Sequence, residues 1–390
     1  MHAPADIPSE PEATDWRARL ELLVLQPTPF CNLDCAYCYL PNRKDTSRMS
    51  MATLDSVIST VATEGWASAQ LSVIWHAGEP LVVGPAWYEE AFEIVAKRIP
   101  QSVAVRHHFQ TNAVLLNASW CEFIKRHNVR VGVSVDGPAF LHDARRRTRD
   151  GKGTHAKVMR GVERLREASV DFNVICVLTR QSLAHPDDIF DFFSGLGARE
   201  IGFNVEEVEA DNAASSLMDA GVEGEFRAFF RRIVERQQAA TQPLRIREFE
   251  KVFAALRSPR FGHLRANMQN RAGHVLTVGW DGSFSTWSPE LLGGVHPDLG
   301  SLALGTSLEG GLDARARARL AVFQDEIGRG IAKCERTCEY FSFCLGGVPA
   351  NKLGEHGRFD GTETMFCRLT EKVMTDVLLD ALDASLPKAG

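Results

Sequence analysis

The first half of the chain alternates between short apolar segments and longer amphipathic ones. Short apolar runs predict buried β-strands, and apolar positions recurring every three or four residues predict helices. The predicted strands are residues 20–26, 71–75, 103–109, 129–135, 172–178 and 201–205. The predicted helices are residues 50–64, 85–98, 119–127, 154–167 and 187–193. Strands separated by helices pair in parallel through right-handed crossovers, so the pattern predicts an α/β fold.

The regular alternation ends after the sixth predicted strand. Amphipathic helices are expected at residues 221–238 and 244–257, and a terminal helix at residues 370–384. Between them the sequence is irregular and rich in glycine, tryptophan, serine and cysteine. We therefore predict a boundary near residue 242. The predicted parts are a disordered, proline-rich tail (1–18), an α/β domain (19–242), and an irregular domain with bridging and terminal helices (243–390).

Composition narrows the class of protein. The chain has 390 residues, 44% of them hydrophobic, and its 44 basic and 50 acidic residues give a net charge of −6. This balance predicts no nucleic-acid partner and no anionic membrane surface. No apolar run reaches the roughly 18 residues of a membrane span, and the first residues lack the features of a signal peptide. Nine cysteines in two main groups do not suggest a disulfide framework, so we predict a cytoplasmic location.

Three cysteines follow the first predicted strand, with the spacing Cys31-x3-Cys35-x2-Cys38. Closely spaced thiols on one loop suit three corners of a four-iron cluster and leave the fourth iron without a protein ligand. Zinc sites are usually built from paired Cys-x2-4-Cys hooks, so a single triplet is a poor half-site for zinc. At this point a zinc loop and three incidental thiols remain alternatives.

The triplet, with Tyr37 just before its last thiol, resembles the signature of the radical S-adenosylmethionine (SAM) enzymes. In that family SAM chelates the open iron, and an electron from the cluster cleaves SAM to methionine and a 5′-deoxyadenosyl radical. The resemblance covers roughly residues 20 to 375. It implies an open partial (β/α)6 barrel, followed here by a small irregular cysteine-rich C-terminal domain and a terminal helix. The chemistry is then expected at the C-terminal ends of the strands.

Motifs at later strand ends extend the resemblance. Residues 76–80 resemble a Gly-Gly-Glu-Pro motif that receives the SAM ammonium, with Ala77 in place of the first glycine. A segment similar to the His-Asp-x-x-Arg of peptide-modifying members ends at Arg146, whose guanidinium suits the SAM carboxylate. Asp136-Gly137-Pro138 is also a turn signature. The implied SAM-binding residues are Tyr37, Gly78, Glu79, Asn112, Ser134 and Arg146.

A second set of thiols lies near the C-terminus. It comprises Cys334, Cys338, Cys344 and Cys367 and resembles the SPASM extension, which provides two auxiliary four-iron clusters from seven cysteines. Residues 268–294, where the first two SPASM cysteines are expected, contain none, and Val348 stands where another is expected. The resemblance therefore implies a single auxiliary [4Fe-4S] cluster held by the four thiols. A four-cysteine zinc site is the alternative.

The surrounding sequence resembles a subset of SPASM-like peptide maturases that includes the GrrM/OscB type. The resemblance implies two [4Fe-4S] clusters, SAM, and a ribosomally made precursor peptide in which a β-carbon is joined to an aromatic ring, giving a cyclophane. It also implies an electron donor such as flavodoxin or ferredoxin. A base must take the ring proton, and Asp281, Glu290 and Glu206 are candidates by position in the chain, although each suits a structural role as well.

Other functions remain open at this stage. One is maturation of a sulfatase, in which a Cys or Ser is oxidised to formylglycine, but that class normally carries all seven SPASM cysteines. Another is formation of a thioether from a peptide Cys. A non-enzymatic alternative is an iron–sulfur or zinc redox sensor or scaffold, which predicts loss of the SAM-contacting groups. Glu79, Ser134 and Arg146 are present, which argues against a scaffold.

Overall fold

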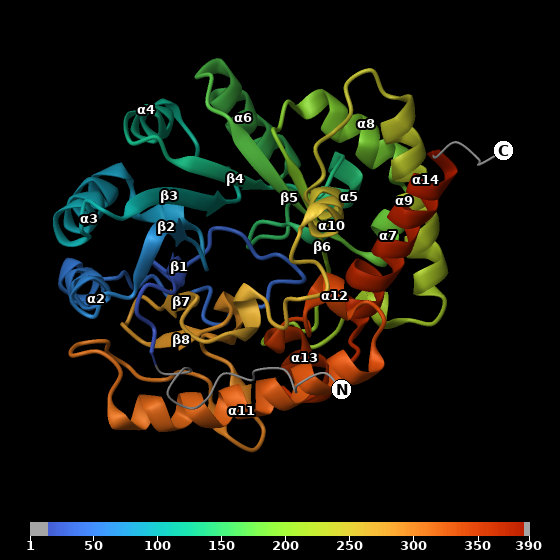
Figure 1. Ribbon diagram of the computed structural model, residues 1–390. Coiled ribbons are helices and arrows are strands. Elements are labelled where there is room, and N and C mark those ends of the chain that lie inside the picture. Colours follow the sequence, from blue (N-terminus) through green and yellow to red (C-terminus); the bar gives the residue numbers. More distant parts are fainter. Residues whose placement is uncertain (1–14, 386–390) are drawn as a thin grey trace.

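An eight-stranded sheet forms the centre of the molecule, with the strand order β6-β5-β4-β3-β2-β1-β7-β8 (Figure 1). The computed structural model describes residues 15–385. The first six strands are β1 (Leu20–Leu25), β2 (Ala67–Trp75), β3 (Ala104–Thr111), β4 (Arg130–Ser134), β5 (Phe172–Leu178) and β6 (Ile201–Val205). These six pair in parallel, and within the described chain no ladder joins β6 to β1. The predicted α/β fold with an open partial barrel is confirmed.

Helices cover the outer side of this sheet, as crossovers between parallel strands require (Figure 1). They are α2 (Met51–Thr63), α3 (Pro85–Arg98), α4 (Ala118–Arg126), α6 (His155–Glu167) and α8 (Pro186–Leu196). The short helices α5 (Ala139–Arg145) and α7 (Arg180–Leu183) lie in segments where the pattern predicts no helix. The apolar side chains of these helices make one continuous core with the strands, so the sheet is rigid where it carries functional groups.

The carboxyl ends of the strands are level with one another. The register pairs are Leu25 with Trp75, Trp75 with Phe109, Thr111 with Val133, Ser134 with Ile175, and Leu178 with Val205. Each strand of the partial barrel is therefore followed by its loop at the same edge of the sheet. This edge brings the cysteine loop and the polar strand ends together, which is the arrangement that sites on α/β barrels use.

The C-terminal region extends the sheet of the barrel. β7 (Val275–Val278) pairs in parallel with β1, and β8 (Phe284–Thr286) pairs antiparallel with β7. The irregular region predicted from residue 243 therefore contributes two strands to the central sheet. Helix α9 (Val222–Ala239) precedes this region. The other helices and strands of the region are α10 (Arg247–Arg257), β9 (Val295–His296), β10 (Gly300–Ser301), α11 (Ala314–Thr337), α12 (Phe341–Cys344), α13 (Pro349–His356), the π-helical η5 (Cys367–Val373) and α14 (Met374–Ser385).

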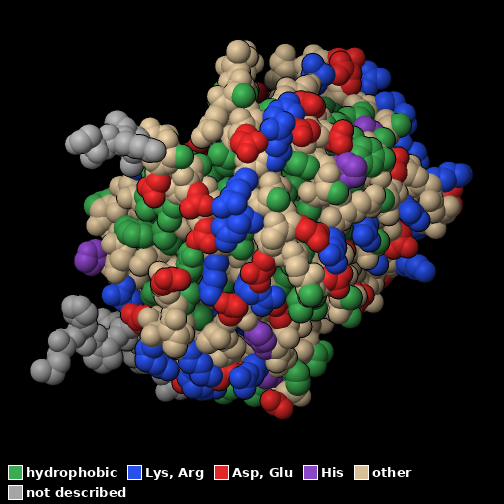
Figure 2. All heavy atoms as spheres, turned by 90° about the vertical axis from the view of Figure 1, so that its right-hand side faces the viewer, with side chains coloured by type: hydrophobic (Ala, Val, Ile, Leu, Met, Phe, Trp, Pro, Cys, Tyr) green, Lys and Arg blue, Asp and Glu red, His purple; other side chains and the backbone are tan. Residues whose placement is uncertain are grey.

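Ion pairs cover the face that carries α9 and α14. Arg227 pairs with Asp376 at 2.8 Å and Arg231 pairs with Asp380 at 3.1 Å, so the two helices are joined along their length. Figure 2 shows basic and acidic side chains interspersed on this face. A mixed surface of this kind offers no continuous basic stripe for a nucleic acid. No helix in the described part of the chain is long and apolar enough to cross a membrane.

A buried aromatic residue, Trp16, lies at the start of the described chain. Trp16 is 1% exposed and packs edge-on against Trp66, with ring centroids 5.0 Å apart. Residues 15–18 of the predicted tail therefore lie against the barrel, and residues 1–14 fall outside the described residues.

Two helical glycines test how tightly the barrel is packed. A Cβ at Gly161 in α6 would lie 2.1 Å from the carbonyl oxygen of Ala113, whereas a Cβ at Gly224 in α9 would meet nothing within 4 Å. We expect Gly161→Ala to lower the free energy of unfolding by about 1–3 kcal/mol through overpacking. Gly224→Ala is the matched control and is expected to raise it by about 0.5–1 kcal/mol. Urea denaturation of both variants measures the difference, and equal effects would contradict this packing.

Candidate functional site

The loop that carries the first three cysteines is held by backbone hydrogen bonds to a distant segment. The amides of Asp34 and Ala36 donate to the carbonyls of Arg147 and Arg145, at 2.8 and 2.9 Å. The guanidinium of Arg149 donates to the carbonyl of Cys31 at 2.6 Å. The basic segment that follows α5 therefore fixes the cysteine loop over the edge of the sheet.

One cavity opens at this edge, with about 1110 Å³ of empty volume. It is lined by all three cysteines of the loop, and by every SAM-contacting residue that the sequence predicts: Tyr37, Gly78, Glu79, Asn112, Ser134 and Arg146. Two predicted base candidates, Glu206 and Glu290, also line it. The third candidate, Asp281, does not line this cavity: its carboxylate accepts from the amide and hydroxyl of Ser283 in a turn. The structure thus gathers the predicted residues, apart from Asp281, around one space.

Glu79 is a buried carboxylate that ties the end of β2 to the end of β3. Its Oε1 accepts from the Thr111 hydroxyl at 2.6 Å, and its Oε2 accepts from the Asn112 amide at 2.9 Å. Burial raises the pKa of Glu79 to about 7, and the hydrogen bonds oppose that rise. Gly78 must precede it, because a Cβ there would lie 2.3 Å from the Thr28 carbonyl oxygen.

Asp136 performs a similar task between β4, β5 and the cysteine loop. Its carboxylate accepts two hydrogen bonds from Arg146, at 2.9 and 3.1 Å, and one from the Val177 amide at 3.0 Å. It also accepts from the Tyr37 hydroxyl at 2.5 Å. Burial raises the pKa of Tyr37, so the phenol remains a donor. Asp136 therefore positions Arg146 and Tyr37, a role that the turn signature in the sequence does not reveal.

Asn112 and Ser134 bring side-chain groups to the same cavity. The side-chain amide nitrogen of Asn112, Nδ2, donates to Asn32 Oδ1 at 2.7 Å and lies 3.8 Å from Cys31 Sγ. The Ser134 hydroxyl accepts from Gln110 Nε2 at 2.9 Å. Asn112 therefore reaches the cysteine loop directly, while Ser134 faces the cavity beside β5.

A group of carboxylates forms the opposite wall of the cavity. Glu206, Glu207 and Glu209 follow β6, and Glu290 comes from the segment after β8. Burial raises the pKa of Glu207 to about 7, and it also raises the pKa of Glu290. From the sequence, Glu207 and Glu209 were not identified as residues of the site. The signal was available, because the run of acids directly follows the sixth strand, where this fold places its chemistry.

The residues around the cavity fit a three-thiol cluster site with SAM beside it. Burial raises the pKa of Cys31 to about 12 and that of Cys35 to about 11, and a cation such as iron beside these thiols would oppose that rise. The cysteines described here form no disulfide. Opposite them, the strand ends offer a carboxylate, amides and a hydroxyl, which are the groups that an amino acid and a ribose require.

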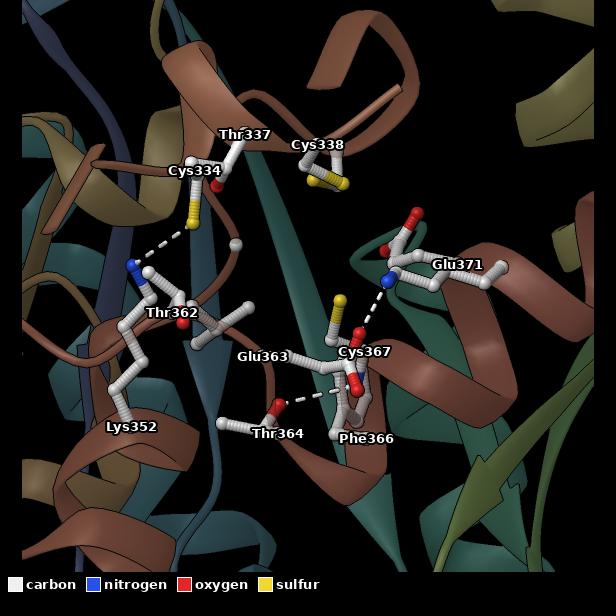
Figure 3. A pocket seen from close by; sticks show the side chains of 15 residues that line it. Cys334, Thr337, Cys338, Lys352, Thr362, Glu363, Thr364, Phe366, Cys367 and Glu371 are labelled. Carbon is white, nitrogen blue, oxygen red and sulfur yellow. Dashed lines mark hydrogen bonds and ion pairs between the residues drawn. The ribbon is translucent and has the colours of Figure 1, made fainter. Parts of the chain in front are cut away.

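The second set of thiols surrounds a separate cavity with about 680 Å³ of empty volume. Cys334 lies in α11, Cys344 in α12 and Cys367 at the start of η5, while Cys338 caps α11. Figure 3 shows the sulfur atoms of Cys334, Cys338 and Cys367 facing a common space. Within residues 15–385, no three His, Cys, Asp or Glu side chains are arranged to hold a single metal ion. Four thiols around a larger space are a donor set that fits a four-iron cluster.

Within residues 268–294, which lack the first SPASM cysteines, the part around Trp287 is packed into the core. Trp287 is 1% exposed, and its indole nitrogen donates to Gln324 Oε1 at 3.1 Å. Its ring packs against Phe323 and Phe359, with centroids 6.1 and 6.3 Å away. Side chains therefore fill this part of the C-terminal region.

We compared the sequence with protein families and with individual proteins. The model of the Radical SAM superfamily matches residues 25–193. The uncharacterized protein sll1766 of Synechocystis is 36% identical over 370 residues, which cover 94% of this chain and 92% of that protein. The serine-type anaerobic sulfatase-maturating enzyme of Klebsiella aerogenes is 33% identical over 177 residues, which cover 45% of this chain and 44% of that enzyme. The match to that enzyme thus spans less than half of each protein.

Solved structures extend the similarity of fold over most of the chain. anSMEcpe with bound AdoMet and Cp18Cys peptide superimposes with a TM-score of 0.71 at 20% identity, covering 94% of this chain and 98% of that one. Streptococcus suis SuiB bound to the precursor peptide SuiA superimposes with a TM-score of 0.61 at 14% identity, covering 89% and 76%. At these identities the comparison establishes the shared fold, including the C-terminal region.

Asp136→Asn tests whether the buried ion pair holds the cysteine loop. The substitution leaves the guanidinium of Arg146, which is 7% exposed, without its carboxylate partner. We expect a loss of about 3–5 kcal/mol in the free energy of unfolding and a large loss of bound iron. Asp34→Asn is the matched control, because Asp34 pairs with Arg43 on the same loop but its side chain is 48% exposed. It should cost less than about 1 kcal/mol. Urea denaturation and iron content check both, and full iron binding by Asp136→Asn would contradict the assignment.

Proposed function

Because this chain belongs to the radical SAM superfamily of enzymes, we propose that it modifies a ribosomally made precursor peptide by joining a side-chain β-carbon to an aromatic ring. The observation that carries the proposal is the shared cavity, which brings the thiols of Cys31, Cys35 and Cys38 together with Arg146 and Glu290. Radical chemistry on a peptide needs a reactive group, a means of positioning and a proton acceptor within one enclosed space.

The residues around the cavity have separate tasks in this proposal. Cys31, Cys35 and Cys38 would hold the cluster, and the SAM contacts would be Tyr37, Gly78, Glu79, Asn112, Ser134 and Arg146. Together, SAM and the cluster supply a 5′-deoxyadenosyl radical, which can take a hydrogen atom from an unactivated carbon. A flavodoxin- or ferredoxin-type donor would supply the electron that this cleavage consumes. The cytoplasmic location remains a prediction from the composition.

Glu290 is the carboxylate best suited to accept the ring proton. Once the new carbon–carbon bond has formed, the ring regains aromaticity by losing one proton and one electron. Glu290 faces the cavity, and burial raises its pKa, so the carboxylate has a greater tendency to take and hold a proton. Glu206 also faces the cavity, but its Oε2 accepts two hydrogen bonds, from the amide and hydroxyl of Ser216 at 2.8 and 2.5 Å. Glu290 Oε2, in contrast, accepts one, from the Ser288 hydroxyl. The electron would leave through the centre at the second cysteine set.

The similar structures support a peptide as the substrate. One holds AdoMet and a peptide, and another holds a precursor peptide, and both superimpose on most of this chain. Sulfatase maturation is the second candidate, favoured by the 33% identity to the Klebsiella enzyme over 177 residues. Two features favour a precursor peptide as the substrate instead: the C-terminal set has only four cysteines, and side chains fill the region around Trp287. The sulfatase class normally carries all seven SPASM cysteines.

Co-expression with the short peptide encoded beside the gene tests the proposed function. We expect each crosslink to remove two hydrogens from the peptide, and tandem mass spectrometry to locate the loss between an aromatic residue and a neighbouring side chain. The triple variant Cys31→Ala, Cys35→Ala, Cys38→Ala should leave the peptide unmodified and form no 5′-deoxyadenosine.

Chemical probes separate the alternative products, because conversion of a Ser to formylglycine and formation of a thioether also remove two hydrogens. Formylglycine reacts with a hydrazide, and a thioether removes an alkylatable thiol. A modified peptide that reacts with hydrazide, or that has lost a thiol, would contradict the crosslink and support one of these alternatives.

Glu290→Gln tests the assignment of the base. The amide cannot accept the ring proton, so we expect at least a roughly tenfold loss of crosslinked peptide, while 5′-deoxyadenosine is still formed. Asp281→Asn is the control, because Asp281 is exposed and lies outside the cavity lining. It should crosslink at the wild-type rate. A Glu290→Gln enzyme with the wild-type crosslinking rate would exclude Glu290 as the base and leave the proposed reaction intact.

A further inference from the structure

A lysine side chain is buried against the second cysteine set. Lys352 in α13 is 4% exposed and lines the cavity that the four thiols surround. Its Nζ donates toward Cys334 Sγ at 3.8 Å (Figure 3). Among the described residues, this ammonium forms no ion pair with a carboxylate. The partner of the Lys352 charge is therefore sulfur.

The other charged groups of this cavity are already paired. Glu371 binds Lys251, with 2.5 Å between the carboxylate and the ammonium, and Glu363 binds Lys372. Each of these two carboxylates therefore has its own ammonium partner, Lys372 within the lining and Lys251 outside it. Lys352 is the remaining cation of the lining, and the four cysteines are what it faces.

Gly330 in α11 lies close to both the backbone at Phe359 and the Lys352 ammonium. A Cβ at Gly330 in α11 would lie 3.1 Å from Lys352 Nζ and 2.7 Å from the carbonyl oxygen of Phe359. Glycine at this position lets the ammonium lie beside α11, within reach of Cys334. A side chain here would push the lysine away from the sulfur or displace the backbone at Phe359.

Burying a lone ammonium costs several kcal/mol unless a negative charge lies beside it. Burial lowers the pKa of Lys352, and negative charge on the sulfurs of Cys334 and Cys344 opposes that effect. An iron–sulfur cluster with four thiolate ligands carries a net negative charge, and the charge becomes one unit more negative when the cluster accepts an electron. A cation at this position therefore stabilises the reduced form more than the oxidised form.

We propose that Lys352 is a positioning residue that balances the charge of the centre held by Cys334, Cys338, Cys344 and Cys367 and makes that centre easier to reduce. The inference rests on the proposed auxiliary cluster. The step it concerns is the uptake of one electron by the oxidised centre, with no bond made or broken. In the proposed reaction this electron comes from the ring adduct, and in the test it comes from dithionite.

Redox titration of the full-length protein, reconstituted anaerobically without peptide, tests the inference. We compare Lys352→Met, which removes the charge, with Lys352→Arg, which keeps it. We measure each variant at the potential where the second centre of the wild type is half reduced. At that potential the ratio of reduced to oxidised centre in Lys352→Met should be about tenfold or more lower than in the wild type. Lys352→Arg should stay near the wild-type ratio. Electron paramagnetic resonance measures the reduction of the second centre. All proteins compared carry Ala in place of Cys31, Cys35 and Cys38, so that the first centre gives no signal.

Lys333→Met is the matched control for loss of a lysine near the same thiols. Lys333 is next to Cys334 in the chain, but its ammonium pairs with Asp360 at 2.6 Å and does not line the cavity. Its removal should leave the ratio within about twofold of wild type, since exposed charges are screened by solvent.

Each outcome bears on the role of the charge. Loss of iron from the second set in Lys352→Met but not in Lys352→Arg would also support a need for the positive charge. An unchanged ratio in Lys352→Met would overturn the inference, as would loss of iron in both variants, because side-chain shape would then be the requirement. Zinc in place of iron at the wild-type site would overturn it as well. None of these results involves the peptide, so each is distinguishable from failure of the proposed crosslinking.

Discussion

Two buried carboxylates hold the separate parts of the reaction cavity in register. Asp136 joins Arg146, Tyr37 and the amide of Val177, which belong to three different segments. Glu79 joins the end of β2 to Thr111 and Asn112 at the end of β3. Burying a carboxylate is costly, and several hydrogen bonds to each oxygen pair offset that cost only when all donors are in place. The cavity is therefore assembled cooperatively, and the cysteine loop depends on partners more than a hundred residues away.

Local sequence patterns predict the barrel and most of the residues that line the cavity. They do not predict which residues far apart in the chain pair with one another. The six strands and the cysteine loop follow from apolar runs and thiol spacing, and the lined cavity gathers the predicted SAM contacts. The role of Asp136 was missed because Asp-Gly-Pro is also a turn signature. Helix α11 was not predicted, since its first turns alternate Ala and Arg and hide the helical period. The pairing of β7 with β1 joins residues about 250 positions apart, which no local pattern encodes.

The C-terminal region differs in character on its two sides. Around Trp287, aromatic side chains fill the interior, and Gln324 satisfies the buried indole nitrogen and the amide of Ala272. Around Cys334 the chain instead surrounds an open space with four thiols and a buried lysine that faces sulfur. A core of packed aromatics is self-sufficient, while thiols and a buried ammonium facing a space need a charged group between them. This contrast is the physical reason for proposing a single centre in the region, at the four cysteines.

Helix α13 connects that centre to the reaction cavity through two consecutive residues. Asn351 donates to Glu207 Oε2 at 2.6 Å and to Glu209 Oε1 at 3.3 Å, on the acidic wall of the cavity. Lys352, the next residue, reaches Cys334 Sγ. Gly354 lets the helix lie against the loop after β6, because a Cβ there would overlap the carbonyl oxygen of Val208. Helix α13 therefore contacts both the four thiols and two carboxylates of the cavity wall, so the proposed electron acceptor and this part of the wall share one support.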